Sequence, residues 1–427
     1  MVTGGQTIRP ITHCRICGRE DLRPVIDLGS QYIASIFAGA DIPEPLGKRY
    51  PLEVVRCASP DGCGLVQLRH SVSPQLLYSH YGYLSGINEA MRINLRDIVQ
   101  KVASMVTLAP GDVVADIGCN DGTLLSFYHD SRIDRLGFDP AENVTRFAQA
   151  KGLEVVQDFF SSEAFRRARP GKKARVITSI AMFYDLEDPG AFAGEVASIL
   201  ADDGVWVIEL SYLPCMLAKN SYDTICHEHL EYFSLRQITW MLDRHGLRVH
   251  GLEFNEVNGG SFRLFIRKQE AGPVPGATRE AIQAVQASEE RLGLGTESPY
   301  LDFREKVVSL SRDLRSLLEE ISSSGKTVYV YGASTKGNTI LQCSGIDRTL
   351  VPKAVDRNPD KWGRSTLGSG IPIISEAQAR LESPDYFLVL PWHFLAVFVE
   401  RERAFLERGG KFILPLPEVR MIGEEAL

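Results

Sequence analysis

The stretch VVADIGCNDGTLL, residues 113–125, decides how this chain folds. Its first five residues are apolar except for one aspartate, which is typical of a buried strand in a parallel sheet. Gly118 and Gly122 follow, before a helical pattern begins. Glycine permits a tight turn and lets the backbone lie close to a ligand. The stretch therefore predicts a strand–loop–helix unit that binds a ligand at its loop.

Apolar runs and helical patterns alternate on both sides of this unit, as in a parallel sheet with crossover helices. Further strands are predicted at 135–139, 175–181 and 204–210. Residues 261–268 predict another strand, at an antiparallel edge of the same sheet. The run AGPVPG at 271–276 then interrupts the alternation and predicts a linker. We therefore expect a central Rossmann-like domain over residues 77–270.

A second, smaller α/β pattern follows the linker. Long helices are predicted at 278–292 and 302–323. Strands are predicted at 327–332, 350–356, 385–390 and 411–414. The first of them enters another glycine turn, YGASTKGN, at 331–338. The pattern predicts a smaller Rossmann-like α/β domain over residues 271–427.

The N-terminal segment, residues 1–76, is marked by four of the chain's eight cysteines: Cys14, Cys17, Cys57 and Cys63. The first two form a knuckle with two residues between them, and the second pair is spaced more widely. Four thiolates in two pairs match a tetrahedral zinc site. Disulfides or unconnected thiols are the alternatives, but so few cysteines in a long chain favour metal binding in a reducing compartment. We therefore predict structural Zn²⁺ and a cytoplasmic location.

The composition argues against several classes of function. The chain has 427 residues, of which 44% are hydrophobic and 24% are charged, as in ordinary globular proteins of more than one domain. A formal net charge of −7 argues against nucleic-acid binding. No run of eighteen apolar residues is present, and residues 1–14 lack the pattern of a signal peptide. We expect neither a nucleic acid nor a membrane as partner.

Residues after the glycine loop indicate which ligand it binds. Asp139 ends the next predicted strand and could accept hydrogen bonds from ribose hydroxyls. Asp158 and Phe159 suit the amino group and the face of an adenine. The loop reads Asp-x-Gly-x-Asn-x-Gly rather than Gly-x-Gly-x-x-Gly, which favours S-adenosylmethionine over a dinucleotide. The alternative is a structural turn with a surface aspartate. The predicted cofactor contacts are Asp116, Gly118, Asn120, Asp121, Gly122, Asp139, Asp158 and Phe159.

The segment DTICHEHLEYFS, residues 223–234, concentrates titratable groups. Its two histidines lie two residues apart, so it is not the His-Glu-x-x-His zinc motif. His229 or His227 could instead remove a proton beside a ketone, because a histidine titrates near the working pH. Glu228 could orient the imidazole, and a nearby phenol could donate to the enolate oxygen. The alternative is a capped surface turn with solvated histidines.

Taken in order, the cysteine pairs, DIGCNDG, the Glu228–His229 pair and YGASTKG resemble the sugar C-methyltransferases of deoxysugar pathways. The resemblance covers residues 14–419. It implies a zinc-binding segment, a class I Rossmann-like methyltransferase domain and a C-terminal α/β domain. It also implies S-adenosylmethionine-dependent methylation at carbon 3 of a TDP-linked 4-keto-sugar.

The resemblance also implies roles for residues. His229 matches the general base and Glu228 its neighbouring glutamate. A tyrosine near the ketone matches Tyr81 or Tyr83, with Tyr81 favoured. A further family tyrosine is replaced here by Cys226, so His227 is expected to take part of its contact with the enolate.

The C-terminal loop is expected to bind the nucleotide. Backbone amides at a helix N-terminus, together with Lys336, suit a pyrophosphate. The sequence DRNPDK at 356–361 resembles the family's Asp-x-x-Pro-Asp-Lys, and PWH at 391–393 could line the same pocket. A half-domain kept only for packing is the alternative. The predicted substrate contacts are Tyr331, Ser334, Thr335, Lys336, Asn338, Asp356, Asn358, Lys361 and His393.

Three hypotheses therefore remain for the whole chain. The leading one is an enzyme that makes an enolate and methylates it from S-adenosylmethionine, with a nucleotide-diphosphate sugar, most simply a TDP-sugar, as acceptor. An epimerase would use the same base without methyl transfer, and a binding protein would have no turnover. The oligomeric state is left open, with a monomer favoured.

Overall fold

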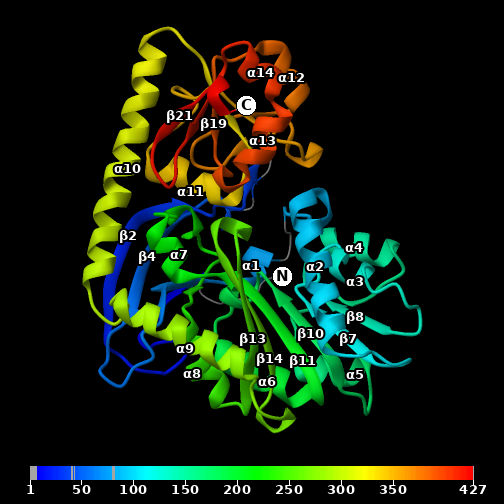
Figure 1. Ribbon diagram of the computed structural model, residues 1–427. Coiled ribbons are helices and arrows are strands. Elements are labelled where there is room, and N and C mark those ends of the chain that lie inside the picture. Colours follow the sequence, from blue (N-terminus) through cyan, green and yellow to red (C-terminus); the bar gives the residue numbers. More distant parts are fainter. Residues whose placement is uncertain (1–6, 40–41, 43, 79–81, 427) are drawn as a thin grey trace.

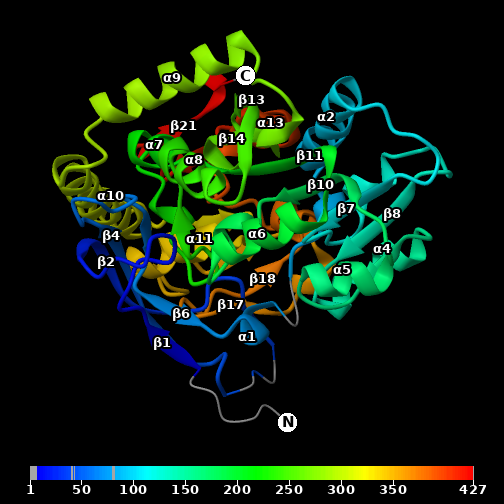
Figure 2. The ribbon, with the colours of Figure 1, turned by 90° about the horizontal axis from the view of Figure 1, so that it is seen from below.

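The computed structural model describes residues 7–39, 42, 44–78 and 82–426. The C-terminal domain lies at the top of Figure 1 and the central sheet below it. The N-terminal strands lie beside the long helix α10 (Ser298–Ser323), which runs along one side of the molecule. Figure 2 gives the view from below.

The central sheet has seven strands in the order β13-β14-β11-β10-β7-β8-β9. Their bounds are β7 (Val113–Ile117), β8 (Asp134–Phe138), β9 (Glu154–Val156), β10 (Ala174–Ile180), β11 (Leu200–Ser211), β13 (Leu247–Asn255) and β14 (Ser261–Lys268). The first five of these are parallel, so the predicted Rossmann-like sheet is confirmed. The strand predicted at 261–268 is antiparallel, but its edge position is wrong. It lies between β11 and β13, which explains why its first six residues are all buried.

Helices cover both faces of this sheet. They are α2 (Glu89–Met105), α3 (Thr123–Ser126), α4 (Glu142–Ala150), α5 (Ser162–Ala168), α6 (Pro189–Ile199) and α8 (Leu235–Asp243). The helix after the glycine loop, α3, is a single turn with glycine as its N-cap.

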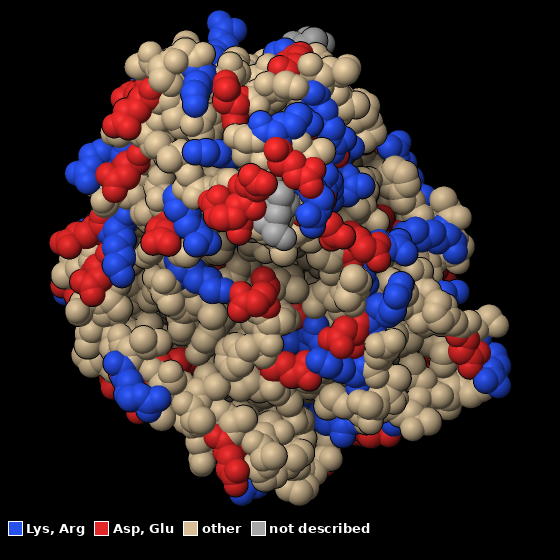
Figure 3. Space-filling view, turned by 45° about the horizontal axis from the view of Figure 1, so that its top comes forward, with Lys and Arg blue, Asp and Glu red and all other residues tan. Residues whose placement is uncertain are grey.

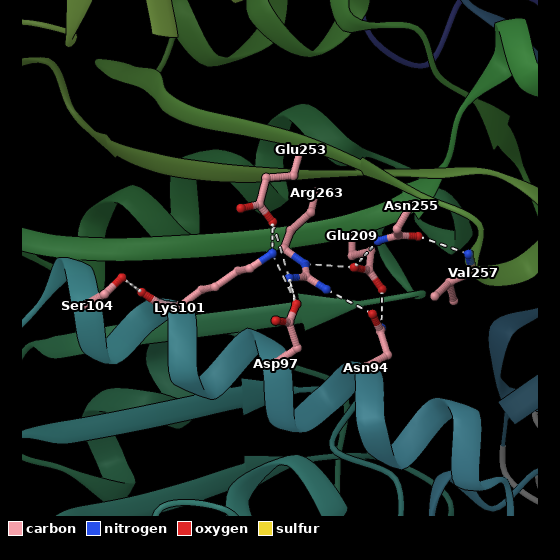
Figure 4. Close-up of polar contacts among 9 residues, drawn as sticks. All are labelled: Asn94, Asp97, Lys101, Ser104, Glu209, Glu253, Asn255, Val257 and Arg263. Carbon is pink, nitrogen blue, oxygen red and sulfur yellow. Dashed lines mark hydrogen bonds and ion pairs between the residues drawn. The ribbon is translucent and has the colours of Figure 1, made fainter. Parts of the chain in front are cut away.

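A buried ionic network fastens α2 to the antiparallel side of the sheet (Figure 4). Arg263 of β14 is 1% exposed, and its guanidinium reaches Glu209 at 2.8 Å and Asp97 at 2.7 Å. Asn94 accepts from Arg263 and donates to Glu209, at 2.8 and 2.5 Å. A buried charge is tolerated only when such partners are complete. The network therefore sets where α2, and the chain entering it, lie against the sheet.

The C-terminal sheet has the order β18-β16-β15-β19-β20-β21. Its strands are β15 (Val328–Tyr331), β16 (Lys353–Val355), β18 (Ile373–Ile374), β19 (Tyr386–Val389), β20 (Lys411–Leu414) and β21 (Arg420–Ile422), of which only the last is antiparallel. Its helices are α11 (Thr335–Cys343), α12 (Glu376–Glu382), α13 (Leu395–Arg401) and α14 (Arg403–Glu407). Helices α9 (Gly276–Arg291) and α10 connect it to the central domain. Helix α10 begins before the predicted residue 302 because proline suits its first turn.

Strands from both other domains complete the N-terminal segment. Its main sheet, in the order β12-β5-β4-β2, joins β2 (Leu22–Tyr32), β4 (Arg49–Cys57) and β5 (Val66–Leu68) to β12 (Glu231–Tyr232). The short β3 (Phe37–Ala38) pairs with β17 (Ser365–Thr366). The three parts of the chain therefore interlock in space. We propose residues 76 and 270 as the domain boundaries along the sequence only.

Within the described ranges, no helix has both the length and the apolar character needed to cross a lipid bilayer. On the face drawn in Figure 3, acidic and basic side chains are interspersed and neither sign forms a continuous field.

Candidate active site

A cavity of about 840 Å³ lies where the three parts of the chain meet. The central domain contributes the loop after β7, the end of β8 and the segment that carries His229. The C-terminal domain contributes the N-terminus of α11 and the loop after β16, and Ser35 and Phe37 come from the N-terminal segment. The volume is within the usual range for ligand sites.

Gly118 and Asp139 form the floor at the central sheet. Gly118 has φ +74°, and a Cβ there would meet Met182 at 3.1 Å, so only glycine fits easily. Each carboxylate oxygen of Asp139 accepts one backbone amide, from Asn120 and from Ala141, at 3.0 Å. Burial raises the pKa of Asp139. This bare backbone beside a fixed carboxylate in the cavity fits a ribose-bearing cofactor.

Four other predicted cofactor contacts also line the cavity, namely Asp116, Asn120, Asp158 and Phe159. Asp158 accepts the amide of Phe159 at 2.8 Å, and the Phe159 ring is 38% exposed. Asp116 is buried and accepts from the Thr178 hydroxyl at 2.5 Å. Burial raises the pKa of Asp116 to about 7, so its carboxyl is partly protonated at neutral pH.

Asn120 and Asp121 of the glycine loop hold the chain before α2. Asn120 accepts the Ser85 amide and donates to the Tyr83 carbonyl, both at 3.0 Å. Asp121 accepts the Gly86 amide at 2.9 Å. These contacts fix residues 83–86, of which Tyr83, Leu84 and Ser85 line the cavity. Asn120 therefore has a second role besides any contact with a cofactor.

Two predicted cofactor contacts are corrected, because Asp121 and Gly122 do not line the cavity. The Asp121 carboxylate is turned to its own helix and to Gly86. A Cβ at Gly122 would lie 2.8 Å from Ala148 and 2.5 Å from Leu153, and its φ is +72°. Gly122 is required for packing against α4, whereas Gly118 opens toward the cavity.

The imidazole of His229 lies in the cavity with its tautomer defined. Its Nδ1 is 2.7 Å from the carbonyl oxygen of Thr224, which can only accept, so Nδ1 carries the proton. The neutral ring then keeps a lone pair on Nε2. The ring packs edge-on against Tyr184, with centroids 4.5 Å apart. Burial and the nearby charge of Lys336 lower the pKa of His229 to about 4, so the basic form prevails at neutral pH.

Two carboxylates, Glu228 and Asp185, line the same cavity as His229. Glu228 is 2% exposed and accepts the Ser35 amide at 3.3 Å, while its Oε2 has no hydrogen-bond partner among the described residues. Asp185 also lines the cavity, and burial and the charge of Glu228 raise its pKa well above the ordinary value. The Tyr78 hydroxyl donates to the Glu228 carbonyl at 3.0 Å.

Tyr184 and Asp185 line the cavity although no sequence motif indicated them. Both follow β10, at the carboxyl end of a parallel strand, where ligands of open α/β sheets bind. That position is the signal that could have found them. Arg357 and Arg401, which also line the cavity, were missed as well.

His227, expected to contact the enolate, does not reach the cavity in this structure. Its side chain is turned away, with Nε2 3.1 Å from the carbonyl oxygen of Tyr50, and it does not line the cavity. Cys226 is completely buried and is also absent from the lining. Tyr83 lines the cavity, whereas Tyr81 lies outside the described residues.

The N-terminus of α11 forms the wall of the C-terminal domain. Ser334 caps it by accepting the Gly337 amide at 3.1 Å, and Thr335 and Lys336 line the cavity beside it. Lys336 donates to the carbonyl of Asn258 at 2.8 Å, and burial lowers the pKa of this lysine. Amides and a cation at a helix N-terminus suit an anionic group.

The loop after β16 supplies further charge. Lys361 donates to the Ala333 carbonyl at 2.7 Å and pairs with Asp356 at 3.1 Å, and both side chains line the cavity with Asn358. His393 lines it as well, and burial lowers its pKa to about 3.

Two further predicted substrate contacts have other partners. The Tyr331 hydroxyl donates to Glu402 at 2.8 Å and Glu376 at 3.0 Å, although the residue borders the cavity. Asn338 is corrected, because it is buried outside the lining and donates to the Ala34 carbonyl at 2.7 Å. Asn338 joins the C-terminal domain to the N-terminal segment.

The four N-terminal cysteines come together as predicted. All are free, and their sulfur atoms lie within 4.8 Å of one another. The Cys14–Cys63 and Cys17–Cys57 sulfur pairs are 3.5 Å apart, close to the roughly 3.8 Å expected of a tetrahedral zinc site. A Cβ at Gly62 would lie 2.7 Å from the Cys57 sulfur, so glycine leaves room for that thiolate. The donor set fits Zn²⁺ with no position left for a catalytic water.

Comparison with protein families gives three matches in the same order as the sheets. Residues 14–78 match a "putative zinc binding domain", 87–252 a "methyltransferase domain" and 256–417 a "C-methyltransferase C-terminal domain". The chain is 33% identical to the C-methyltransferase NovU of Streptomyces niveus, over 98% of this chain and 99% of the relative.

Solved structures give weaker similarities. The magnesium protoporphyrin IX methyltransferase of Synechocystis PCC 6803, with bound SAM, is 16% identical, with a TM-score of 0.32 over 42% of this chain and 79% of that chain. A SAM-dependent methyltransferase of Archaeoglobus fulgidus is 19% identical, with a TM-score of 0.33 over 42% and 94%. Similarity at this level says nothing about substrate or mechanism.

Proposed function

The chain belongs to the C-methyltransferase family and is an S-adenosylmethionine-dependent C-methyltransferase, and from this premise we propose that it methylates a carbon beside the ketone of a nucleotide-linked 4-keto-deoxysugar. One observation carries the proposal. The unprotonated Nε2 of His229 lies in a cavity between a cofactor loop and an anion-binding helix N-terminus.

His229 acts as the general base. A carbon beside a ketone becomes nucleophilic once its proton leaves, and Nε2 accepts that proton while Nδ1 stays bonded to the Thr224 carbonyl. The negative charge of Glu228 favours the protonated ring of His229, so it stabilises the imidazolium as it forms. Tyr81 or Tyr83 supplies the phenol that donates to the enolate oxygen.

Gly118, Asp139, Asp158 and Phe159 hold the cofactor. S-adenosylmethionine, when bound, supplies an electrophilic methyl group. The chain itself aligns the acceptor carbon with that methyl group, and such alignment contributes much of the rate of a bimolecular step.

The C-terminal wall holds the nucleotide. Lys336 and the amides at the start of α11 contact the diphosphate, and Arg357 and Lys361 add positive charge at the same wall. A TDP-sugar in the cytoplasm is the acceptor we propose.

Mass spectrometry in heavy water tests the proposal. Purified protein with S-adenosylmethionine and TDP-4-keto-6-deoxyglucose should give a product heavier by one methyl group. His229→Asn should lower the rate by about 10²- to 10⁴-fold. His245→Asn, remote from the cavity, is the matched control and should keep full activity.

The other outcomes separate the alternatives. Deuterium incorporation without methyl gain would replace the proposal by an epimerase that uses the same base. No reaction with several nucleotide-linked keto-sugars would reject the sugar acceptor while leaving the methyltransferase assignment in place.

A further inference from the structure

Two hydrogen bonds join the C-terminal domain to the segment that carries His229. The indole Nε1 of Trp392 donates to Asp223 Oδ2 at 3.0 Å. The hydroxyl of Thr339, in α11, donates to the carbonyl of Ile225 at 3.0 Å. Both donors belong to the C-terminal domain, and their two acceptors flank Thr224 on either side.

Thr224 is the residue on which the orientation of His229 depends. Its carbonyl accepts the Nδ1 proton at 2.7 Å, and its hydroxyl oxygen lies 3.4 Å from the same nitrogen. The position of that carbonyl decides which ring nitrogen is unprotonated and where it points. Two hydrogen bonds from another domain therefore hold the group that sets the base.

These contacts lie in the interior. Asp223 is 1% exposed, Thr339 is fully buried and Trp392 is 9% exposed. Hydrogen bonds are electrostatically stronger in such surroundings, and losing one partner leaves a buried polar group unsatisfied. Neither Thr339 nor Trp392 lines the cavity, so neither is placed to contact the sugar or the cofactor.

One helix links the Thr339 hydrogen bond to the anion-binding wall. Ser334, Thr335 and Lys336 line the cavity at the start of α11, and Thr339 lies one turn later on the same helix, about 5 Å along its axis. A nucleotide bound at the first turn is thereby placed in fixed register with the Thr224 carbonyl. The C-terminal domain, which is proposed to bind the nucleotide, thus also orients His229.

We infer that Thr339 and Trp392 are positioning residues for the proposed deprotonation: through Ile225 and Asp223 they fix the Thr224 carbonyl, and so the tautomer and aim of His229. This inference rests on the proposed function for its kinetic consequence, but its structural content concerns His229 alone. The two parts can therefore be tested separately.

Nitrogen-15 NMR of imidazole-labelled protein without substrate tests the structural part. In the wild-type protein the His229 signal, identified by its loss in His229→Asn, should show a protonated Nδ1 and an unprotonated Nε2 at neutral pH. Thr339→Val and Trp392→Phe should each mix the tautomers. Thr366→Val, which removes an equally buried hydroxyl bonded to Ser369 and Ile371 of the same domain, should not.

Kinetics test the functional part. Thr339→Val and Trp392→Phe should slow deuterium exchange at the acceptor carbon and kcat by about 10- to 100-fold. KM for both substrates should stay within about threefold, because the cavity lining is intact. The double variant should lose less than the product of the single losses, since both act through one carbonyl.

Specific results would overturn the inference. Unchanged His229 tautomers in both variants would overturn it whatever the enzyme's substrate proves to be. So would a loss of kcat no larger than that of Thr366→Val at equal thermal stability, or a loss confined to KM. Mixed tautomers in a protein that exchanges no sugar proton would support the positioning role and reject the proposed acceptor instead.

Discussion

Two strand–glycine–helix turns, after β7 and after β15, are similar in sequence but differ in what their glycines and helices contact. In the first, Gly118 leaves bare backbone at the cavity floor, and α3 is a single turn whose N-cap, Gly122, offers no side-chain hydrogen bond. In the second, a Cβ at Gly332 would lie 2.5 Å from Pro391, and α11 is a nine-residue helix capped by Ser334. We propose that the first turn receives a ligand against its backbone, whereas the second presents a helix to its surroundings.

The difference lies in what each helix touches. Helix α3 follows directly after Asn120 and Asp121, which bind the backbone amides of Ser85 and Gly86. Helix α11 reaches out, with Lys336 bonded to Asn258 and Thr339 to Ile225. Both units thus begin with a glycine turn. The length of the following helix and its polar side chains determine what each unit contacts.

Alanine at the two glycines of the first turn should separate packing from ligand approach. Gly122→Ala should lower the free energy of unfolding by about 3 kcal/mol, because its Cβ collides with α4 at a left-handed φ. Gly118→Ala should cost about 1 to 2 kcal/mol, since its nearest neighbour is the flexible Met182, and should weaken S-adenosylmethionine binding. Urea unfolding and calorimetric titration measure the two effects, and equal destabilisation would contradict this division.

Asp139→Ala should weaken ligand binding at the first turn and leave ligand binding at the second turn unchanged. Losing hydrogen bonds between a carboxylate and ribose hydroxyls should weaken S-adenosylmethionine binding by about 10- to 100-fold, at about 1.5–3 kcal/mol. TDP should bind as before, because it is expected at the second turn. Asp356→Asn, the acidic residue beside Lys361, is the counterpart, and titrations with both ligands compare the two. Loss of TDP binding in Asp139→Ala would show that the two turns do not bind separate ligands.

Lys336→Met should shift the pH dependence of the rate. His229 is active when neutral, so the rate falls as pH drops through its folded pKa of about 4. Because the charge of Lys336 contributes to lowering that pKa, its removal should move the acid limb of kcat/KM to higher pH. Lys336→Arg should leave the limb near its original place, as should Lys219→Met, which does not act on His229. An unmoved limb in Lys336→Met would contradict the assigned electrostatic effect.

The lowered pKa values of His229 and His393 also make the free energy of unfolding depend on pH. His229 and His393 have folded pKa values of about 4 and 3, both below the ordinary 6.5. The unfolded chain therefore binds more protons, and stability is lost as pH falls from about 6.5 toward those values. Lys336→Met should reduce this loss, because its charge lowers both values.

Much of the fold was predictable because it depends on local pattern. Apolar runs bounded by turn residues located β7 and β20 almost to the residue, and two pairs of cysteines located the metal site. Pairing between distant segments was not predictable. The edge strand β13 and the pairing of β12 with β5 depend on contacts that no local pattern encodes.

The site was predictable by segment more than by side chain. His227 and His229 are neighbours in a conspicuous run, yet one bonds to Tyr50 and the other enters the cavity. Gly122 and Asn338 belong to segments predicted to bind ligands, but both face neighbouring chain. Which way each points is decided by packing, which a motif does not describe.

The interlocked N-terminal segment has a consequence during translation. Strand β5 needs β12, and β3 needs β17, which a ribosome adding about 5–20 residues per second completes roughly ten seconds to a minute later. The four cysteines, in contrast, are all made before β5. The four zinc ligands are therefore available on the nascent chain before the sheet is complete, and a bound Zn²⁺ would join the end of β4 to the segment before β2 at that stage.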